Sequence, residues 1–251
     1  MGLTGSRFAS SPVSGPTRPY YQHLTRLSRA LALTADVAML TLGGDLKRKE
    51  MLSARLGDVL SHLYMASAVL KRYEDDGRQR GDLAYVEYAV QRHLHLIAEA
   101  FRGFFNNFPN RVVAWTLRLA VFPLGIHFAA PRDSQLQAIA DDMMVPGATR
   151  DRHTFLCYWK DDPKDMTGHM ELAFLRMKEN EAVYKRLQKA EKRGEIPPDL
   201  AGDELVKAAR KAEVLSADEA KVIKQVEKLR LTAIAVDQFA PGTLEKKAFA
   251  K

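Results

Sequence analysis

MLSARLGDVLSHLYMASAVLKRYEDDG, residues 51–77, is the most regular helical pattern in the sequence. Its apolar side chains recur in alternating steps of four and three residues, at Leu52, Leu56, Val59, Leu63, Ala66, Leu70 and Tyr73. Such steps place the side chains on one face of an α-helix, and that face needs a partner helix. An acidic run and Gly77 end the pattern. The stretch therefore predicts a long helix within a helical bundle.

Similar patterns precede and follow this helix. Residues 20–42 carry an apolar stripe that Gly43 and Gly44 end, and Asp45 is then expected to cap the next helix. A third helix is expected to begin at Asp82, with a stripe of Val86, Val90, Leu94, Ile97, Phe101, Phe104 and Phe108. Because the connections are short, the three helices favour an antiparallel bundle.

Helical patterns continue to the C-terminal third, and no segment shows the sustained alternation of a strand. A long charged helix is expected at 166–193 and another at 216–236, where Ser216 and Glu219 have the spacing of a capping box. We therefore expect an all-α fold without a sheet. Its parts would be an extended arm at 1–19 that is ordered by docking, a helical bundle at 20–130, an irregular connector with short helices at 131–165, and a charged helical segment at 166–251.

Composition narrows the choice of partners and compartment. The chain has 251 residues, of which 46% are hydrophobic, and a formal net charge of +7. Polyanions are conceivable partners, but Lys and Glu alternate through the C-terminal third as on an ordinary solvated surface, and no nucleic-acid motif is present. We expect no nucleic-acid partner. Cys157 is the only cysteine, which excludes an intrachain disulfide and favours a reducing compartment.

Two segments are candidates for contact with a membrane or a protein partner. Residues 112–130 are largely apolar, but Arg118 and Pro123 interrupt them, so a membrane span is not expected. They form either a buried helix that bends or ends at Pro123, or a helix on a membrane or partner surface, using Trp115, Leu119, Phe122 and Ile126. The run Lys47, Arg48 and Lys49 is expected in the first turn of a helix, where its charge opposes the helix dipole. Three things could offset this unfavourable charge: solvation together with the neighbouring Glu50, an acidic protein partner, or lipid headgroups.

The residue patterns predict no catalytic, cofactor-binding or metal-binding residue. No glycine-rich phosphate loop is present, and Gly43-Gly44 follows a helix instead of a strand. The pairs Asp58 with His62 and His95 with Glu99 leave a metal ligand set short. Cys157 lies four residues from His153, but a small buried apolar role is favoured over that of a nucleophile.

Several longer strings resemble the C-terminal region of the large bacterial FAD-dependent acyl-CoA dehydrogenases. They mix Gly, Pro and charge in a fixed order, and the likeness runs through essentially the whole chain. The strings are Ser10–Pro16, Leu42–Glu50, Leu56–Ser61 with Leu70–Glu74, Asn107–Arg111 followed by Trp115, Arg230-Leu231, and Val236 to Phe239.

The resemblance implies a part of an enzyme of fatty-acid β-oxidation that converts acyl-CoA to trans-2-enoyl-CoA. In that family a glutamate removes the α-proton, FAD accepts the β-hydride and an electron carrier reoxidises the flavin. The flavin, the thioester pocket and the glutamate belong to helical and β-barrel parts that precede the matched region. None of Glu50, Glu74 and Glu99 matches the family's motif. The chain alone is therefore expected to bind no FAD and to be inactive.

The resemblance also implies partners. They are the upstream dehydrogenase body, the acyl-CoA and electron carrier that the whole enzyme uses, and a second copy in a homodimer. Larger family members use an extra C-terminal helical domain in membrane association or dimer packing, which would place the protein in the cytoplasm, peripheral to the inner membrane. A non-catalytic docking module for a membrane or protein partner is the alternative function.

Overall fold

The computed structural model of the chain describes residues 6–160, 162 and 164–236. These residues form α-helices and one 3-10 turn and contain no strand, so the predicted all-α class is confirmed. The chain divides into two compact units, 1–144 and 145–251. The boundary between the two units falls inside the connector predicted at 131–165. The bounds of all four predicted segments remain predictions.

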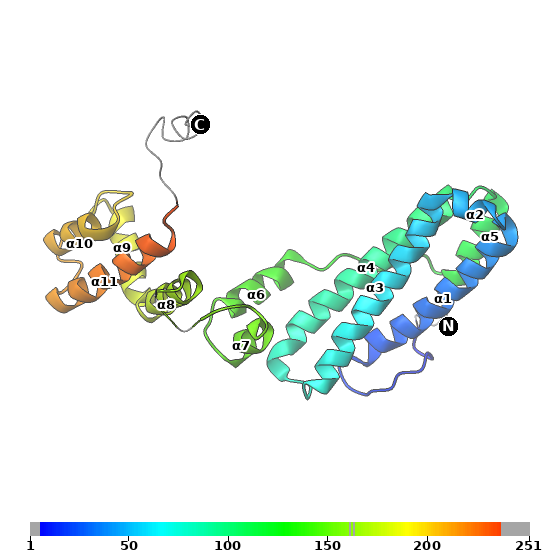
Figure 1. Cartoon of the computed structure of the whole chain (residues 1–251), viewed down its shortest axis with the longest axis horizontal. Coiled ribbons are helices and arrows are strands. Elements are labelled where there is room, and N and C mark those ends of the chain that lie inside the picture. The colour runs from blue at the N-terminus through cyan, green and yellow to red at the C-terminus, as the bar shows by residue number, and fades with distance from the viewer. Residues whose placement is uncertain (1–5, 161, 163, 237–251) are drawn as a thin grey trace, which may run out of the picture. The chain divides into compact units, whose positions relative to one another are not determined.

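Three long helices build unit 1: α1 (Arg18–Leu42), α3 (Glu50–Asp75) and α4 (Leu83–Asn107) (Figure 1). Helix α3 packs on both α1 and α4. All seven apolar positions predicted for the third helix are buried, six of them on α4 and Phe108 directly after its last residue. Six of the seven predicted for the second are buried on α3, and the other, Leu56, is partly buried against the same core. The stripes predicted from the sequence are therefore the contact faces of the bundle.

The connections between these helices differ in one respect from the prediction. Asp45 does not cap α3; it is the first residue of the short helix α2 (Asp45–Arg48), whose N-cap is Gly44. Lys49 then leaves the helical region, with φ −93° and ψ 60°, and α3 begins at Glu50. At the other end, Gly77 has φ +79° and the turn η1 (Arg80–Asp82) leads into α4. The left-handed backbone at Gly77 suits a residue without a Cβ.

The N-terminal arm lies against α1. Gln22 donates through Nε2 to the carbonyl oxygens of Arg7, at 2.8 Å, and of Ala9, at 3.2 Å. Thr25 Oγ1 donates to the carbonyl of Ser10 at 3.2 Å, and Ala9 is buried. Side chains of α1 thus satisfy backbone groups of a segment that forms no helix of its own.

Two shorter helices complete unit 1. Helix α5 (Arg111–Val121) is capped by Asn110, whose side chain accepts from the backbone N–H of Val113 at 3.1 Å, and it ends two residues before Pro123. Helix α6 (Asp133–Met143) packs on α4, where the hydroxyl of Tyr85 donates to Asp142 at 2.7 Å. No helix among the described residues is long and apolar enough to span a bilayer.

Unit 2 contains α7 (Ala148–Thr154), α8 (Met166–Glu179), α9 (Glu181–Lys192), α10 (Gly202–Lys211) and α11 (Ala217–Ala233). The single helix expected at 166–193 is wrong, because Asn180, with φ −103°, separates α8 from α9. The predicted capping box is confirmed: Glu219 N donates to Ser216 Oγ at 3.2 Å, and Ser216 N donates to Glu219 Oε2 at 2.9 Å. Residues 237–251, which include the quoted Asp237 to Phe239, lie outside the described residues.

A buried carboxylate joins three helices of unit 2. Glu227 on α11 is 1% exposed. It accepts from the Tyr184 hydroxyl of α9 at 2.8 Å and from the backbone N–H of Gly202, the first residue of α10, at 2.9 Å. Arg230 donates to both carboxylate oxygens, at 2.9 Å each. Burial raises the pKa of Glu227, but the hydrogen bonds from Arg230, Gly202 and Tyr184 outweigh it, so the pKa is lowered overall.

Candidate functional site

The basic run singled out in the sequence is fully available to solvent. Lys47, Arg48 and Lys49 are all exposed, and the closest carboxylate to Arg48 is that of Asp45, at 3.9 Å between two largely exposed side chains. Such a pair contributes little stability. Lys47 and Arg48 belong to α2, a helix of a single turn, and precede the first turn of α3. The expected unfavourable first-turn position is therefore wrong for these two residues.

Helix α5 is apolar on two opposite faces. Ala114, Leu117 and Val121 are buried against the bundle. On the outer face, Trp115 is 68% exposed and Leu119 is 49% exposed, and Val112, one turn before Trp115, is 74% exposed. Because residues three and four apart share a helix face, these three side chains form one exposed apolar stripe. Ile126, also predicted for this face, is half-buried and packs against the core.

Phe122 corrects the predicted contact face. It is 3% exposed and lies just beyond the end of α5, where the chain turns inward. Its ring meets the rings of Phe101 at 5.3 Å and Phe105 at 6.2 Å between centroids, and the guanidinium of Arg26 lies 5.1 Å from its centroid. The sequence pattern assumed that the helix continued to this position; because it stops at Val121, the Phe122 side chain enters the core instead.

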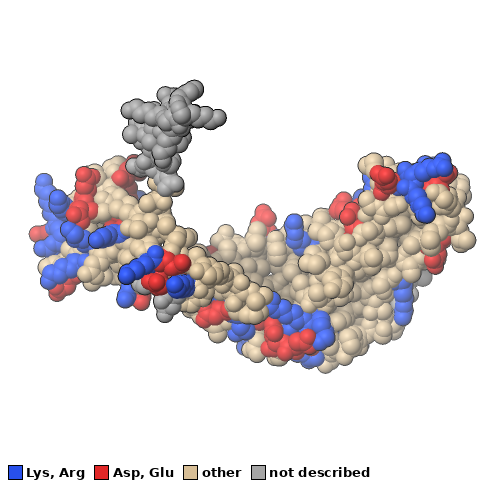
Figure 2. All heavy atoms as spheres, viewed as in Figure 1, with Lys and Arg blue, Asp and Glu red and all other residues tan. Residues whose placement is uncertain are grey.

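The basic run and the α5 stripe lie at the same end of unit 1 (Figure 1). Arg111, the first residue of α5, donates to the carbonyls of Phe105 and Asn106 at the end of α4, at 3.2 and 2.8 Å. Helix α3 begins beside that same end of α4, where the Arg55 side chain lies against Gly103. Figure 2 shows Lys and Arg side chains gathered where α2 lies. We call Lys47, Arg48, Lys49, Val112, Trp115 and Leu119 the bundle-end surface.

The polar pairs considered for chemistry do not form as pairs. His62 Nδ1 lies 3.2 Å from His93 Nδ1, not on Asp58, and His95 Nδ1 lies 3.0 Å from the carbonyl oxygen of Phe128. Glu99 pairs with Arg102. Within the described part of the chain, no three His, Cys, Asp or Glu side chains gather as metal ligands would.

Cys157 is exposed, so the prediction of a buried apolar role is wrong. Helix α7 ends at Thr154, and Cys157 therefore lies on no helix face that packs. It borders a pocket of about 490 Å³ that also contains Phe155, Trp159 and the ion pair of Arg150 with Glu171. That pair is bidentate, with N–O distances of 2.8 and 2.6 Å.

A comparison with known families finds a match along most of the chain. The model of the bacterial-type acyl-CoA dehydrogenase C-terminal region matches residues 1–239. The chain belongs to this family. The match covers unit 1 and almost all of unit 2, and it confirms the resemblance that the quoted strings indicated. No solved structure matches the chain.

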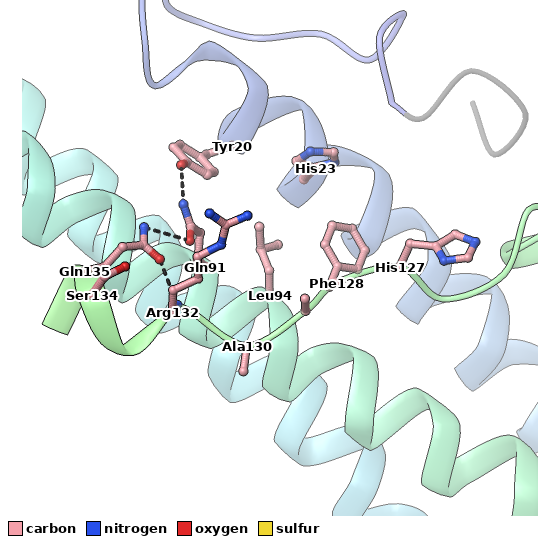
Figure 3. Close-up of a pocket in the computed structure, with 11 residues that line it drawn as sticks. Tyr20, His23, Gln91, Leu94, His127, Phe128, Ala130, Arg132, Ser134 and Gln135 are labelled. Carbon is pink, nitrogen blue, oxygen red and sulfur yellow. Dashed lines mark hydrogen bonds between the residues drawn. The ribbon is translucent and has the colours of Figure 1, made fainter.

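Sequence reasoning missed one feature of this acyl-CoA dehydrogenase C-terminal region. A pocket of about 560 Å³ lies in unit 1 between α1, α4, α6 and the loop before α6 (Figure 3). Its polar residues include Tyr20, Gln91, Arg132 and Gln135. They come from distant parts of the chain, and no local spacing joins them. Only the packing of α1 and α6 on the bundle brings them together.

Proposed function

We propose that this chain is the helical accessory part of an acyl-CoA dehydrogenase of fatty-acid β-oxidation. The whole enzyme would convert an acyl-CoA to the trans-2-enoyl-CoA, and FAD would supply the hydride acceptor. Family membership over residues 1–239 is the observation that carries this proposal. The upstream dehydrogenase body would hold the flavin, the acyl-CoA and the catalytic glutamate, and would meet the electron carrier. A homodimer stays a prediction.

Three glutamates of unit 1 support placing the catalytic glutamate in the upstream body. Glu74 accepts from Thr17 Oγ1 at 3.2 Å and from Arg78, which ties the start of α1 to the end of α3. Glu99 is held by Arg102, and Glu50 is exposed in the first turn of α3. All three therefore have structural or solvated positions.

The glycine pair of the sequence does not form a phosphate-binding loop. Gly43 and Gly44, the only adjacent glycines of the chain, follow helix α1 and are exposed, with no atom near enough to meet an added Cβ. A phosphate-binding loop instead brings backbone N–H groups close to the anion at the start of a helix that follows a strand.

The absorbance spectrum of the purified 251-residue chain, compared with that of the chain joined to the dehydrogenase body, tests the placement. We expect flavin absorbance and acyl-CoA oxidation only when the body is present. Stoichiometric FAD on the isolated chain would contradict it. Failure of a body with intact flavin to bind the chain would contradict the accessory role.

We also propose that the bundle-end surface docks on an anionic membrane. Its charge supports this choice, because three exposed cations lie at the same end of unit 1 as an exposed Trp and two aliphatic side chains. Trp prefers the membrane interface, and basic residues are attracted to anionic headgroups. Each Lys or Arg near such a surface contributes about 1 kcal/mol, so the run Lys47–Lys49 is worth on the order of 3 kcal/mol.

Vesicle flotation tests this docking. The wild-type chain should float with phosphatidylglycerol vesicles and not with phosphatidylcholine vesicles. Changing Trp115 and Leu119 to Ala, or the three basic residues to Gln, should abolish flotation. The matched control is Leu60→Ala with Tyr64→Ala, which removes exposed apolar side chains from α3 instead. Equal flotation of all variants, or binding of the surface to the dehydrogenase body alone, would overturn the membrane proposal.

A further inference from the structure

One hydrogen-bond chain organises the polar side of the pocket between α1, α4 and α6 (Figure 3). Arg132 N donates to Gln135 Oε1 at 2.9 Å, and Gln135 Nε2 donates to Gln91 Oε1 at 3.2 Å. Gln91 Nε2 in turn donates to the Tyr20 hydroxyl oxygen at 3.0 Å. Because that oxygen accepts from Gln91, the hydroxyl proton of Tyr20 remains available as a donor.

A single guanidinium supplies the charge of this pocket. Figure 3 shows the Arg132 side chain extending beside Gln91 and Leu94 toward α1. The described residues that line the pocket include no Asp or Glu. Arg132 therefore forms no ion pair with another lining residue. Burial, with a smaller effect of Arg26, lowers the pKa of His23, which lines the pocket from α1 together with Tyr20, so its imidazole is neutral at neutral pH.

The other lining residues are mainly apolar, apart from His127 and Ser134. The apolar ones are Leu94, Phe128, Ala129 and Ala130, and the His23 ring meets the Phe128 ring edge-on at 5.2 Å between centroids. The volume of about 560 Å³ is within the range of sites for small ligands, roughly 300–1,000 Å³. The pocket therefore combines one cation, a hydroxyl donor and a hydrocarbon wall.

We propose that this pocket binds a small amphipathic carboxylate, with its head on Arg132 and Tyr20 and its hydrocarbon part against Leu94 and Phe128. A guanidinium fork matches the two oxygens of a carboxylate, and one cation balances its single charge. A phosphate, with about two charges at neutral pH, would require more cationic partners. This inference stands independently of membrane docking and of the dehydrogenase reaction.

Ligand titration by NMR tests the site, with hexanoate as the probe. Hexanol, which lacks the negative charge, and inorganic phosphate, which lacks the hydrocarbon chain, are the comparison ligands. The wild-type chain should bind hexanoate saturably and the other two much more weakly. Because Arg132 is exposed, Arg132→Gln should raise Kd by about 3- to 5-fold, and Tyr20→Phe by roughly 3- to 10-fold. The matched control is Arg118→Gln, which removes an exposed arginine from α5 and should leave Kd within about 2-fold.

Each other result overturns the proposal. Hexanol binding as tightly as hexanoate would indicate an apolar cleft without a carboxylate site, and equal phosphate binding would indicate a simple anion site. No saturable binding, or an unchanged Kd in both Arg132→Gln and Tyr20→Phe, would exclude the site. Thermal melts of both variants identify a folding defect, and if one variant unfolds, the Kd of the other decides.

Discussion

The imidazole rings of His62 and His93 meet between α3 and α4 with their Nδ1 atoms 3.2 Å apart. At this distance one Nδ1 donates and the other accepts, so the two rings cannot both be protonated while the hydrogen bond persists. Burial, His62 and Arg92, in that order, lower the pKa of His93. The contact couples the packing of two long helices to the protonation of one ring.

Acid should therefore destabilise unit 1. Because the pKa of His93 is lower in the folded state, the unfolded chain binds more protons near pH 6.5, the ordinary pKa of an imidazole. The stabilisation is present above that value and is lost as pH falls through the folded pKa. Urea unfolding between about pH 7 and pH 5 should show a smaller pH dependence in His93→Gln than in wild type. His127→Gln, which removes an exposed ring, is the control, and an unchanged slope in His93→Gln would contradict the prediction.

Glu227 should be the most sensitive carboxylate of unit 2. Glu227→Ala leaves the Arg230 guanidinium, the Tyr184 hydroxyl and the Gly202 N–H without their acceptor. Removing one partner of a buried ion pair costs about 3–5 kcal/mol, and we expect a loss of that order in urea unfolding followed by circular dichroism. Glu204→Gln, at an exposed position of α10, should change stability by less than about 0.5 kcal/mol. Equal losses in both variants would refute the structural role of Glu227.

Phe122 and Trp115 should respond oppositely in two assays. Phe122→Ala opens a cavity beside Phe101 and Phe105 and should lower the unfolding free energy by about 3–5 kcal/mol. Trp115→Ala removes an exposed ring and should cost under about 1 kcal/mol, while weakening vesicle binding. Thermal denaturation and flotation of the same two proteins provide the check. Comparable stability losses in the two variants would place Trp115 in the core as well.

Replacing two helical glycines with Ala should change the unfolding free energy in opposite directions. At Gly57 on α3 an added Cβ meets no atom within 4 Å, so Gly57→Ala should stabilise unit 1 by about 0.5–1 kcal/mol through helix propensity. At Gly168 on α8 the added Cβ would collide with the carbonyl oxygens of Lys160 and Asp162. Gly168→Ala should therefore destabilise unit 2 by about 1–3 kcal/mol. Urea midpoints measure both, and a stabilised Gly168→Ala would show that these two carbonyls do not pack on α8.

The bundle was predictable because its signal is repeated many times. The apolar positions of residues 86–108 recur over six turns of helix, and every one is buried. The capping box of Ser216 and Glu219 was also predictable, because both hydrogen bonds lie within four residues. Such local patterns need no knowledge of what packs on them.

Most of the errors concern where helices begin and end. Lys49 and Asn180 interrupt helices although neither is a Gly or Pro, with ψ angles of 60° and 15°. Phe122 shows the consequence for a site, since stopping the helix at Val121 turned a predicted surface residue into the core. The pocket between α1, α4 and α6 could not be predicted for another reason. Tyr20 and Gln91 are 71 residues apart in the sequence, and Gln91 and Gln135 are 44 apart. Only tertiary packing joins them.

The hydrogen bonds at Glu227 have a consequence for how unit 2 opens. One side chain holds donors from α9, α10 and α11. Detaching any one of these helices would expose the others' buried polar groups, so local fraying is discouraged and the three should open as one cooperative unit. The slowest-exchanging amide hydrogens of α9, α10 and α11 should accordingly share one opening free energy. A protease should cleave within these helices only when all three come apart.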